Sequence, residues 1–135
     1  MQFLKSLMLV TIFFLPVFLS QAITELPPCM KVELFYRHYL TALDEPKNPN
    51  VDRVLKEHLP ASLIKKVKRI QTEEGYDPIV EGQDYSPKWK TTLHVTPVYQ
   101  KGNISTCKVE IDPTWKQIII VKIKEMQIID FSPPK

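Results

Sequence analysis

Three histidines, His38, His58 and His94, are the side chains best suited to proton transfer near neutral pH. The helical pattern places His38 at the edge of a helix face, and His58 at a helix end, where the dipole favours a cation. His94 shares one face of a predicted strand with Thr92 and Thr96. No nucleophile or orienting partner can be assigned to it, so the sequence favours an exposed sheet histidine over a general base.

Three carboxylates in one segment, Asp77, Glu81 and Asp84, could bind Ca²⁺ or act as an acid and a base. Their spacing does not match the calcium-binding loop of alternating oxygen ligands, and acids in turns usually cap backbone amides. Ser62 and Ser105 lie outside any Gly-x-Ser-x-Gly context. We therefore expect a non-enzymatic protein with no catalytic residue, no metal and no cofactor.

The two cysteines, Cys29 and Cys107, form an even pair. In an exported protein such a pair favours a disulfide. Two buried free thiols are the alternative, because geometry decides whether the bond forms. A zinc site is disfavoured, since the cysteines lack the short spacing of zinc ligands.

The N-terminus is typical of a signal peptide. Lys5 precedes an apolar run over residues 7–19, and a small-residue pattern ends at Ala22. A membrane anchor is the alternative, but a spanning helix needs roughly 20 apolar residues, and this run is shorter and is broken by Pro16. The sequence predicts cleavage after Ala22 and a periplasmic or secreted protein.

Length and charge limit what the remaining chain can be. The sequence of 135 residues has a net charge of +3, and removal of residues 1–22 takes away one lysine and no acid, which leaves +2. Basic residues cluster at 65–69, but apolar residues lie among them at helical spacing, as on the solvated face of an amphipathic helix. Nucleic-acid binding is not expected. Residues 23–135 have the size of a single domain with one core.

The N-terminal half of that domain has the apolar spacing of helices. Apolar residues recur at intervals of three and four from Cys29 to Leu43, which predicts one helix. Asn50 is placed to begin a short helix, and Pro60 opens another that runs toward Thr72.

The C-terminal half changes to the alternation of strands. Residues 93–98 and 107–111 predict two antiparallel strands, with a bulge at Pro97 and a turn between them. Residues 115–124 are apolar on both faces and predict a central strand covered on both sides, either by a helix layer on each face or by a dimer interface. Residues 126–131 predict a final strand. Helices followed by a four-stranded meander give an α+β fold.

Between the two halves, residues 75–90 predict an ordered loop. The segment holds two prolines, two of the three glycines and three aromatic residues, Tyr76, Tyr85 and Trp89. It is too apolar for a flexible linker and too interrupted for a helix or strand. Long ordered loops often carry function.

Several short motifs together resemble a group of bacterial periplasmic proteins of unknown function. They are Phe35-Tyr36-Arg37-His38-Tyr39-Leu40, Tyr76-Asp77-Pro78, Gly82-Gln83-Asp84-Tyr85, Trp89, Val95-Thr96-Pro97-Val98 and the closing segment from Ile123 to Ile129. The likeness covers most of the chain after residue 22. It implies the cone-shaped fold of nuclear transport factor 2 and cystatin-like domains, in which helices pack on a curved antiparallel sheet of about four strands.

Some members of this group resemble immunity proteins of type VI secretion, which block effectors that cleave the cell wall. The resemblance implies a non-catalytic inhibitor whose partner is a peptidoglycan hydrolase. The contact residues would be Gln83, Asp84, Tyr85 and Trp89, because tryptophan and tyrosine anchors dominate tight interfaces.

The alternative is a small-ligand carrier or an enzyme that uses the concave face of the sheet. His94, Thr92, Tyr36 and Tyr39 would line that pocket. Proteins with this type of fold include both enzymes and inert binders, so the fold does not choose between the two functions.

Overall fold

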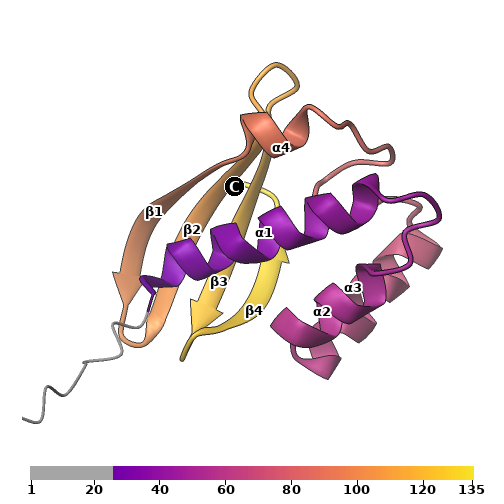
Figure 1. The fold of residues 1–135 in the computed structure, drawn as a ribbon. Helices are drawn as coiled ribbons and strands as arrows, with labels where there is room; N and C mark the ends of the chain where they lie inside the picture. Colours follow the sequence, from indigo (N-terminus) through magenta and orange to yellow (C-terminus); the bar gives the residue numbers. More distant parts are fainter. Residues whose placement is uncertain (1–25) are drawn as a thin grey trace, which may run out of the picture.

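The computed structural model describes residues 26–135 (Figure 1). The predicted signal peptide, residues 1–22, lies outside the described residues. The elements, in order, are α1 (Pro28–Asp44), α2 (Val51–His58), α3 (Ala61–Glu73), α4 (Trp89–Thr92), β1 (His94–Lys101), β2 (Ile104–Asp112), β3 (Gln117–Lys124) and β4 (Gln127–Ser132). Among the described residues, no helix has the length and apolarity needed to cross a membrane.

The four strands form one antiparallel sheet in the order β1-β2-β3-β4. Helix α1 crosses one face of this sheet, and α2 and α3 lie together near β4 (Figure 1). The predicted α+β fold is therefore confirmed. The predicted bulge is present, since the β1–β2 register shifts between Pro97 and Tyr99.

The core lies between α1 and the inner face of the sheet. One stripe of α1 is fully buried because its apolar residues recur at helical spacing. Alternate residues of β2 and β3 face this stripe, as the two-residue period of a strand requires. The fully buried side chains of α1, β2 and β3 include Val32, Phe35, Tyr36, Tyr39, Leu40, Val109, Ile111, Ile119, Val121 and Ile123.

Within residues 26–135, strand β3 is covered on one face only. Ile119 and Val121 have no exposed surface, whereas Ile118 and Ile120 on the opposite face are half-buried. Ile120 pairs across the sheet with Lys108 of β2, so charged side chains share this outer face. The prediction of a helix layer on both faces of this strand was therefore wrong, whereas a dimer interface on the outer face stays a prediction. β-branched residues suit a half-buried pleated surface as well as a core, so an apolar run does not by itself require a second layer.

Two boundaries also differ from the sequence-based expectation. Trp115 was expected on a strand but lies in the turn between β2 and β3, with 78% of its surface exposed. Trp89 was expected in a loop but begins α4, a helix of 4 residues. A helix this short has too few residues for a periodic signal.

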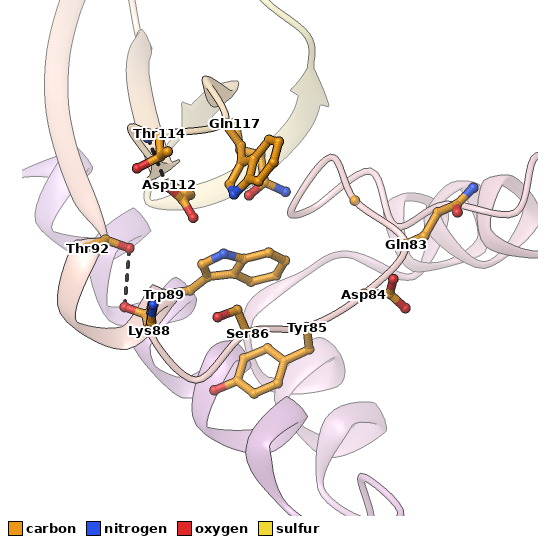
Figure 2. A pocket seen from close by; sticks show the side chains of 12 residues that line it. Gln83, Asp84, Tyr85, Ser86, Lys88, Trp89, Thr92, Asp112, Thr114 and Gln117 are labelled. Carbon is orange, nitrogen blue, oxygen red and sulfur yellow. Dashed lines mark hydrogen bonds between the residues drawn. The ribbon is translucent and has the colours of Figure 1, made fainter.

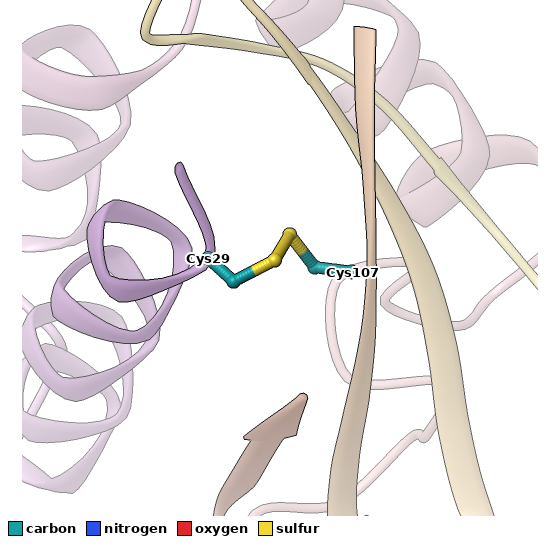
Figure 3. Close-up of a disulfide and its surroundings, with 2 residues drawn as sticks. All are labelled: Cys29 and Cys107. Atoms are coloured by element: carbon teal, nitrogen blue, oxygen red, sulfur yellow. A yellow bond between two sulfur atoms is a disulfide. The ribbon is translucent and has the colours of Figure 1, made fainter. Parts of the chain in front are cut away.

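A disulfide joins Cys29 in the first turn of α1 to Cys107 in β2, with their Cα atoms 5.7 Å apart (Figure 3). The bond fixes the N-terminal end of α1 on the sheet, and it confirms the pairing favoured by the sequence.

Candidate functional site

An open cleft of about 740 Å³ lies at the end of the sheet where α4 and the β2–β3 turn come together (Figures 1 and 2). We refer to it as the end cleft. It is lined by Gly82, Gln83, Asp84, Tyr85, Ser86, Lys88, Trp89, Thr92, Asp112, Thr114, Trp115 and Gln117. Two segments of the chain, 82–92 and 112–117, therefore form its walls: the first supplies the loop and α4, and the second supplies the β2–β3 turn.

Two tryptophans give the end cleft its apolar surface. Trp89 is 5% exposed, and its ring packs edge-to-face against Tyr85 with centroids 5.7 Å apart. Figure 2 shows the Trp89 indole between Tyr85 and Ser86 on one side and Gln117 on the other. The indole of Trp115, in contrast, is 78% exposed. Trp89 is thus part of the folded core, and Trp115 is available to a partner.

The first wall of the cleft is anchored by two tyrosines of α1. The Tyr36 hydroxyl donates a hydrogen bond to the Ile79 carbonyl at 2.7 Å. The Tyr39 hydroxyl donates to Asp77 Oδ2 at 2.5 Å, while Asp77 Oδ1 accepts from the Ile79 amide at 2.9 Å. Asp77 also pairs with Gly82 through a backbone bridge. These contacts hold the start of the 75–90 loop on the core.

Burial decides the electrostatics of this anchor. Burial raises the pKa of the Asp77 carboxyl above its ordinary value, although hydrogen bonds from Tyr39 and the Ile79 amide oppose the shift. Burial, and then the charge of Asp77, raises the pKa of Glu81. Tyr39 has its pKa raised well above the ordinary value, first by burial. The Asp77–Tyr39 pair has little access to solvent, so its role is to position the loop.

The second wall, α4, is tied to both layers of the fold. Lys90 Nζ lies 2.5 Å from Asp44 Oδ2 at the end of α1, and this contact lowers the pKa of Asp44. The Thr92 hydroxyl donates to the Ile111 carbonyl of β2 at 2.5 Å. The position of Trp89 is therefore set by α1 on one side and the sheet on the other.

The third wall is the β2–β3 turn. The Thr114 amide donates to Asp112 Oδ1 at 2.9 Å, and Lys116 has a left-handed backbone with φ of 50°. Gln117 Nε2 donates to the Val80 carbonyl at 3.4 Å, which links this turn to the 75–90 loop. A Cβ atom on Gly82 would lie 2.9 Å from Gln117 Nε2, so a larger residue at that position would displace the Gln117 amide from this contact. The turn that carries Trp115 is thus held from both ends.

The sequence-predicted contact residues Gln83, Asp84, Tyr85 and Trp89 all line the end cleft, and Thr92 lines it with them. The Tyr85 hydroxyl is buried near Asp44, and burial, followed by the charge of Asp44, raises its pKa.

The four residues predicted to line a concave pocket lie in three different places. Tyr36 and Tyr39 are 0% and 1% exposed, because the helical stripe that carries them is the core face of α1. His94 is exposed on β1, paired with Glu110. Only Thr92 reaches the end cleft. The structure therefore does not bring these four side chains together around one cavity.

Sequence reasoning missed the residues contributed by the β2–β3 turn, namely Asp112, Thr114, Trp115 and Gln117. The available signal was the Asp112-Pro113 turn followed directly by a tryptophan. A large aromatic residue in a turn has no strand partner to cover it, and this could have marked Trp115 as a surface residue.

Comparison with known proteins gives similarity at the level of the fold. No family model matches this chain, and no curated protein matches it in sequence. A protein of unknown function from Bacteroides thetaiotaomicron has a TM-score of 0.61 at 20% identity, over 78% of this chain and 88% of that chain. A chain of the type VI effector–immunity complex Tae3-Tai3 from Ralstonia pickettii has a TM-score of 0.62 at 14% identity, over 81% of this chain and 100% of that chain.

A second structure of the Tae3-Tai3 complex agrees, with a TM-score of 0.58 at 15% identity. At these identities the comparisons establish a common fold. They are compatible with the predicted resemblance to immunity proteins, and they do not test the likeness to nuclear transport factor 2 or to cystatins.

Proposed function

We propose that this chain is a non-enzymatic binding protein that neutralises a protein effector, as immunity proteins of type VI secretion do. The observation that carries the proposal is Trp115, an indole exposed to 78% on a turn that is fixed by hydrogen bonds beside the end cleft. Exposure of so large an apolar group is unfavourable in water and is compensated when a partner covers it. Rigid aromatic anchors of this kind dominate tight interfaces.

The fold supports the same reading. The matched chain of the Tae3-Tai3 complex is covered over its whole length, so the likeness is not confined to a fragment. The effector of this chain would be a peptidoglycan hydrolase, as the resemblance of the motifs implies.

The location we propose is the periplasm. The leader at residues 1–22 would direct export, and the Cys29–Cys107 disulfide is consistent with an oxidising compartment. Effectors that cleave the cell wall act in that compartment, so the proposed location and the proposed partner agree.

The net charge of +2 after removal of the leader offers little electrostatic steering. We therefore propose that affinity comes from apolar contact around Trp115 and polar contacts from Gln83 and Asp84. Binding should then depend only weakly on salt concentration.

The experiment has two steps. The protein, tagged at its C-terminus, is used to capture partners from the envelope and secreted fractions of its own organism, and each captured protein is then directed to the periplasm of a test bacterium. Growth arrest by the captured protein, relieved when our chain is co-expressed, would support the proposal. The proposal fails if no captured protein arrests growth, or if co-expression of our chain leaves the arrest unchanged.

A second candidate function is the binding of a small molecule in the end cleft. The cleft volume of about 740 Å³ and its mixture of indole, amide and carboxylate groups favour this possibility. A soluble ligand that raises the melting temperature of the wild type, but not of Trp115→Ala, would favour it over protein binding.

A further inference from the structure

Two histidines that are 20 positions apart in the sequence face one another on neighbouring helices. His38 Nδ1 of α1 lies 3.0 Å from His58 Nε2 of α2, and the ring centroids are 5.2 Å apart. This pair is separate from the end cleft, and no step of the proposed function uses it.

We propose that His38 and His58 form a binding site for one divalent transition-metal ion that prefers ligands at right angles, Cu²⁺ or Ni²⁺. Imidazole nitrogens bind such ions at about 2.0–2.1 Å. Two nitrogens at that distance lie about 2.9 Å apart when the angle between them is about 90°, and about 3.3 Å apart in a tetrahedron. The observed 3.0 Å is the length of the present hydrogen bond, and it is close to the first separation, so a square-planar or octahedral ion would need little change in the distance between the two nitrogens.

One of the two rings is held in place by packing, and a small rotation of the exposed ring would turn both nitrogens toward a common ion. The ring of His58 packs against the Phe35 ring, with centroids 5.5 Å apart and an interplanar angle of 60°. Phe35 is fully buried, so this contact fixes the half-buried His58 on the core. His38 lies at the exposed end of the pair and leaves the site open to solvent.

Metal binding would replace the bond between the two rings, because a neutral imidazole nitrogen is the form that ligates metals. One of the two facing nitrogens carries the proton of the present N–H···N bond. When the ion replaces this bond, the ring that donated it carries its proton on its second nitrogen instead. Both facing nitrogens can then ligate the ion, and the net charge of the two rings does not change.

Space and charge beside the pair allow the ion to keep water ligands. A hollow of about 200 Å³ opens next to His38, and Glu45 and Glu57 are among the residues that line it. Lys31 places a positive charge near His58, and Arg53 lies in the hollow 3.8 Å from Glu57, so two cations balance the two carboxylates.

No group of three or more potential ligands is placed to hold a metal among residues 26–135. The ion would therefore have two protein ligands and complete its coordination with water.

The test uses the protein without a histidine tag, titrated with CuSO₄ and separately with NiCl₂ by calorimetry. We expect one ion per chain, and the electron paramagnetic resonance spectrum of the Cu²⁺ complex should show coupling to two imidazole nitrogens. His38→Ala and His58→Ala should each lower the association constant by at least about tenfold, since each removes one of only two protein ligands.

His94→Ala is the matched control, because His94 is the remaining histidine and is exposed on β1. It should leave the affinity unchanged. His38 is exposed, so His38→Ala should retain the circular dichroism of the wild type and keep the test valid even if His58→Ala unfolds. In addition, Ni²⁺ should raise the melting temperature of the wild type but not of His38→Ala.

The proposal is overturned if the wild type binds neither ion, if His38→Ala binds as tightly as the wild type, or if His94→Ala loses as much affinity as His38→Ala. A Cu²⁺ spectrum with coupling to no imidazole or to a single one would also overturn it.

Discussion

The Tyr39 hydroxyl donates a hydrogen bond to Asp77 across 2.5 Å, although the two residues are 38 positions apart in the sequence. Tyr39 belongs to the core face of α1, and Asp77 begins the loop that leads into the end cleft. The geometry of the candidate contact surface therefore depends on a hydrogen bond to the core.

Tyr39→Phe should destabilise the protein by about 2 kcal/mol, because it leaves a largely buried carboxylate with one donor fewer. Tyr36→Phe is the matched control, since it removes a hydroxyl that donates to a neutral carbonyl. Its expected cost is about 1 kcal/mol. Urea unfolding of both variants at pH 7 measures the difference. Equal losses would contradict a special role for the charged acceptor.

Asp77 should also make stability depend on pH. Its folded-state pKa is raised by burial, so its contribution is fully present below the unfolded pKa of about 3.9 and is lost as pH rises through the folded pKa. Asp77→Asn keeps a neutral side chain that can accept from the Ile79 amide and pair with Tyr39. The variant should therefore gain stability relative to the wild type as pH rises from about 4 toward 7. Unfolding free energies measured across this range provide the check, and a difference that stays constant with pH would refute the assignment.

Trp115→Ala should weaken partner binding by about tenfold or more while leaving the melting temperature nearly unchanged, because the indole is 78% exposed. Tyr99→Ala serves as the control. Tyr99 is 57% exposed near the C-terminal end of β1, whereas the end cleft adjoins the N-terminal end of that strand, so its loss should not affect binding.

Trp89→Ala is a poor probe of the same surface, because Trp89 is 5% exposed and its truncation should cost about 3–5 kcal/mol in stability. Calorimetric titration of the captured effector with Trp115→Ala and with Tyr99→Ala shows whether Trp115 contributes to binding and Tyr99 does not. Unchanged binding by Trp115→Ala would show that this residue is not in the interface. Neutralisation of an effector would then be tested by the growth assay alone.

Neighbouring residues of β3 should respond very differently to truncation. Ile119→Ala should cost about 3 kcal/mol or more, because Ile119 is fully buried against the helical layer. Ile120→Ala should cost about 1 kcal/mol, since Ile120 is half-buried on the outer face. Thermal unfolding of the pair tests whether the sheet is covered on one face. Similar large losses would indicate that a second layer covers the outer face in solution.

Reduction of the Cys29–Cys107 disulfide should lower the free energy of unfolding by about 4 kcal/mol, because the bond closes a long loop in the unfolded chain. The double variant Cys29→Ala/Cys107→Ala should be nearly as unstable as the reduced wild type, and its free energy of unfolding should not change when reductant is added. Urea unfolding with and without dithiothreitol makes the comparison. A wild type that is equally stable in both conditions would rule out a stabilising bond.

The elements with long periodic patterns could be predicted from the sequence. The spacing of apolar residues located α1, and the alternation at β2 and β4 located those strands, because one buried face imposes a regular period. The bulge at Pro97 followed from its missing amide.

The site could be predicted only in part. Gln83 to Trp89 were found because aromatic residues and turn residues gather there in one segment. The Trp115 wall was missed because it is brought to the cleft by sheet pairing, which joins Asp112 to Gln117 across the turn. The His38–His58 contact depends on how two helices pack, and no local pattern encodes that distance.

The disulfide has a consequence for how the protein is made. Cys29 is near the N-terminal end of the described chain, whereas its partner is supplied by the second strand of the sheet, so a ribosome has to synthesise most of the chain before the two sulfurs can combine. A product truncated before residue 107 would lack the partner of Cys29 and could not form this bond. The bond therefore forms only after β2 has been synthesised and has packed against α1.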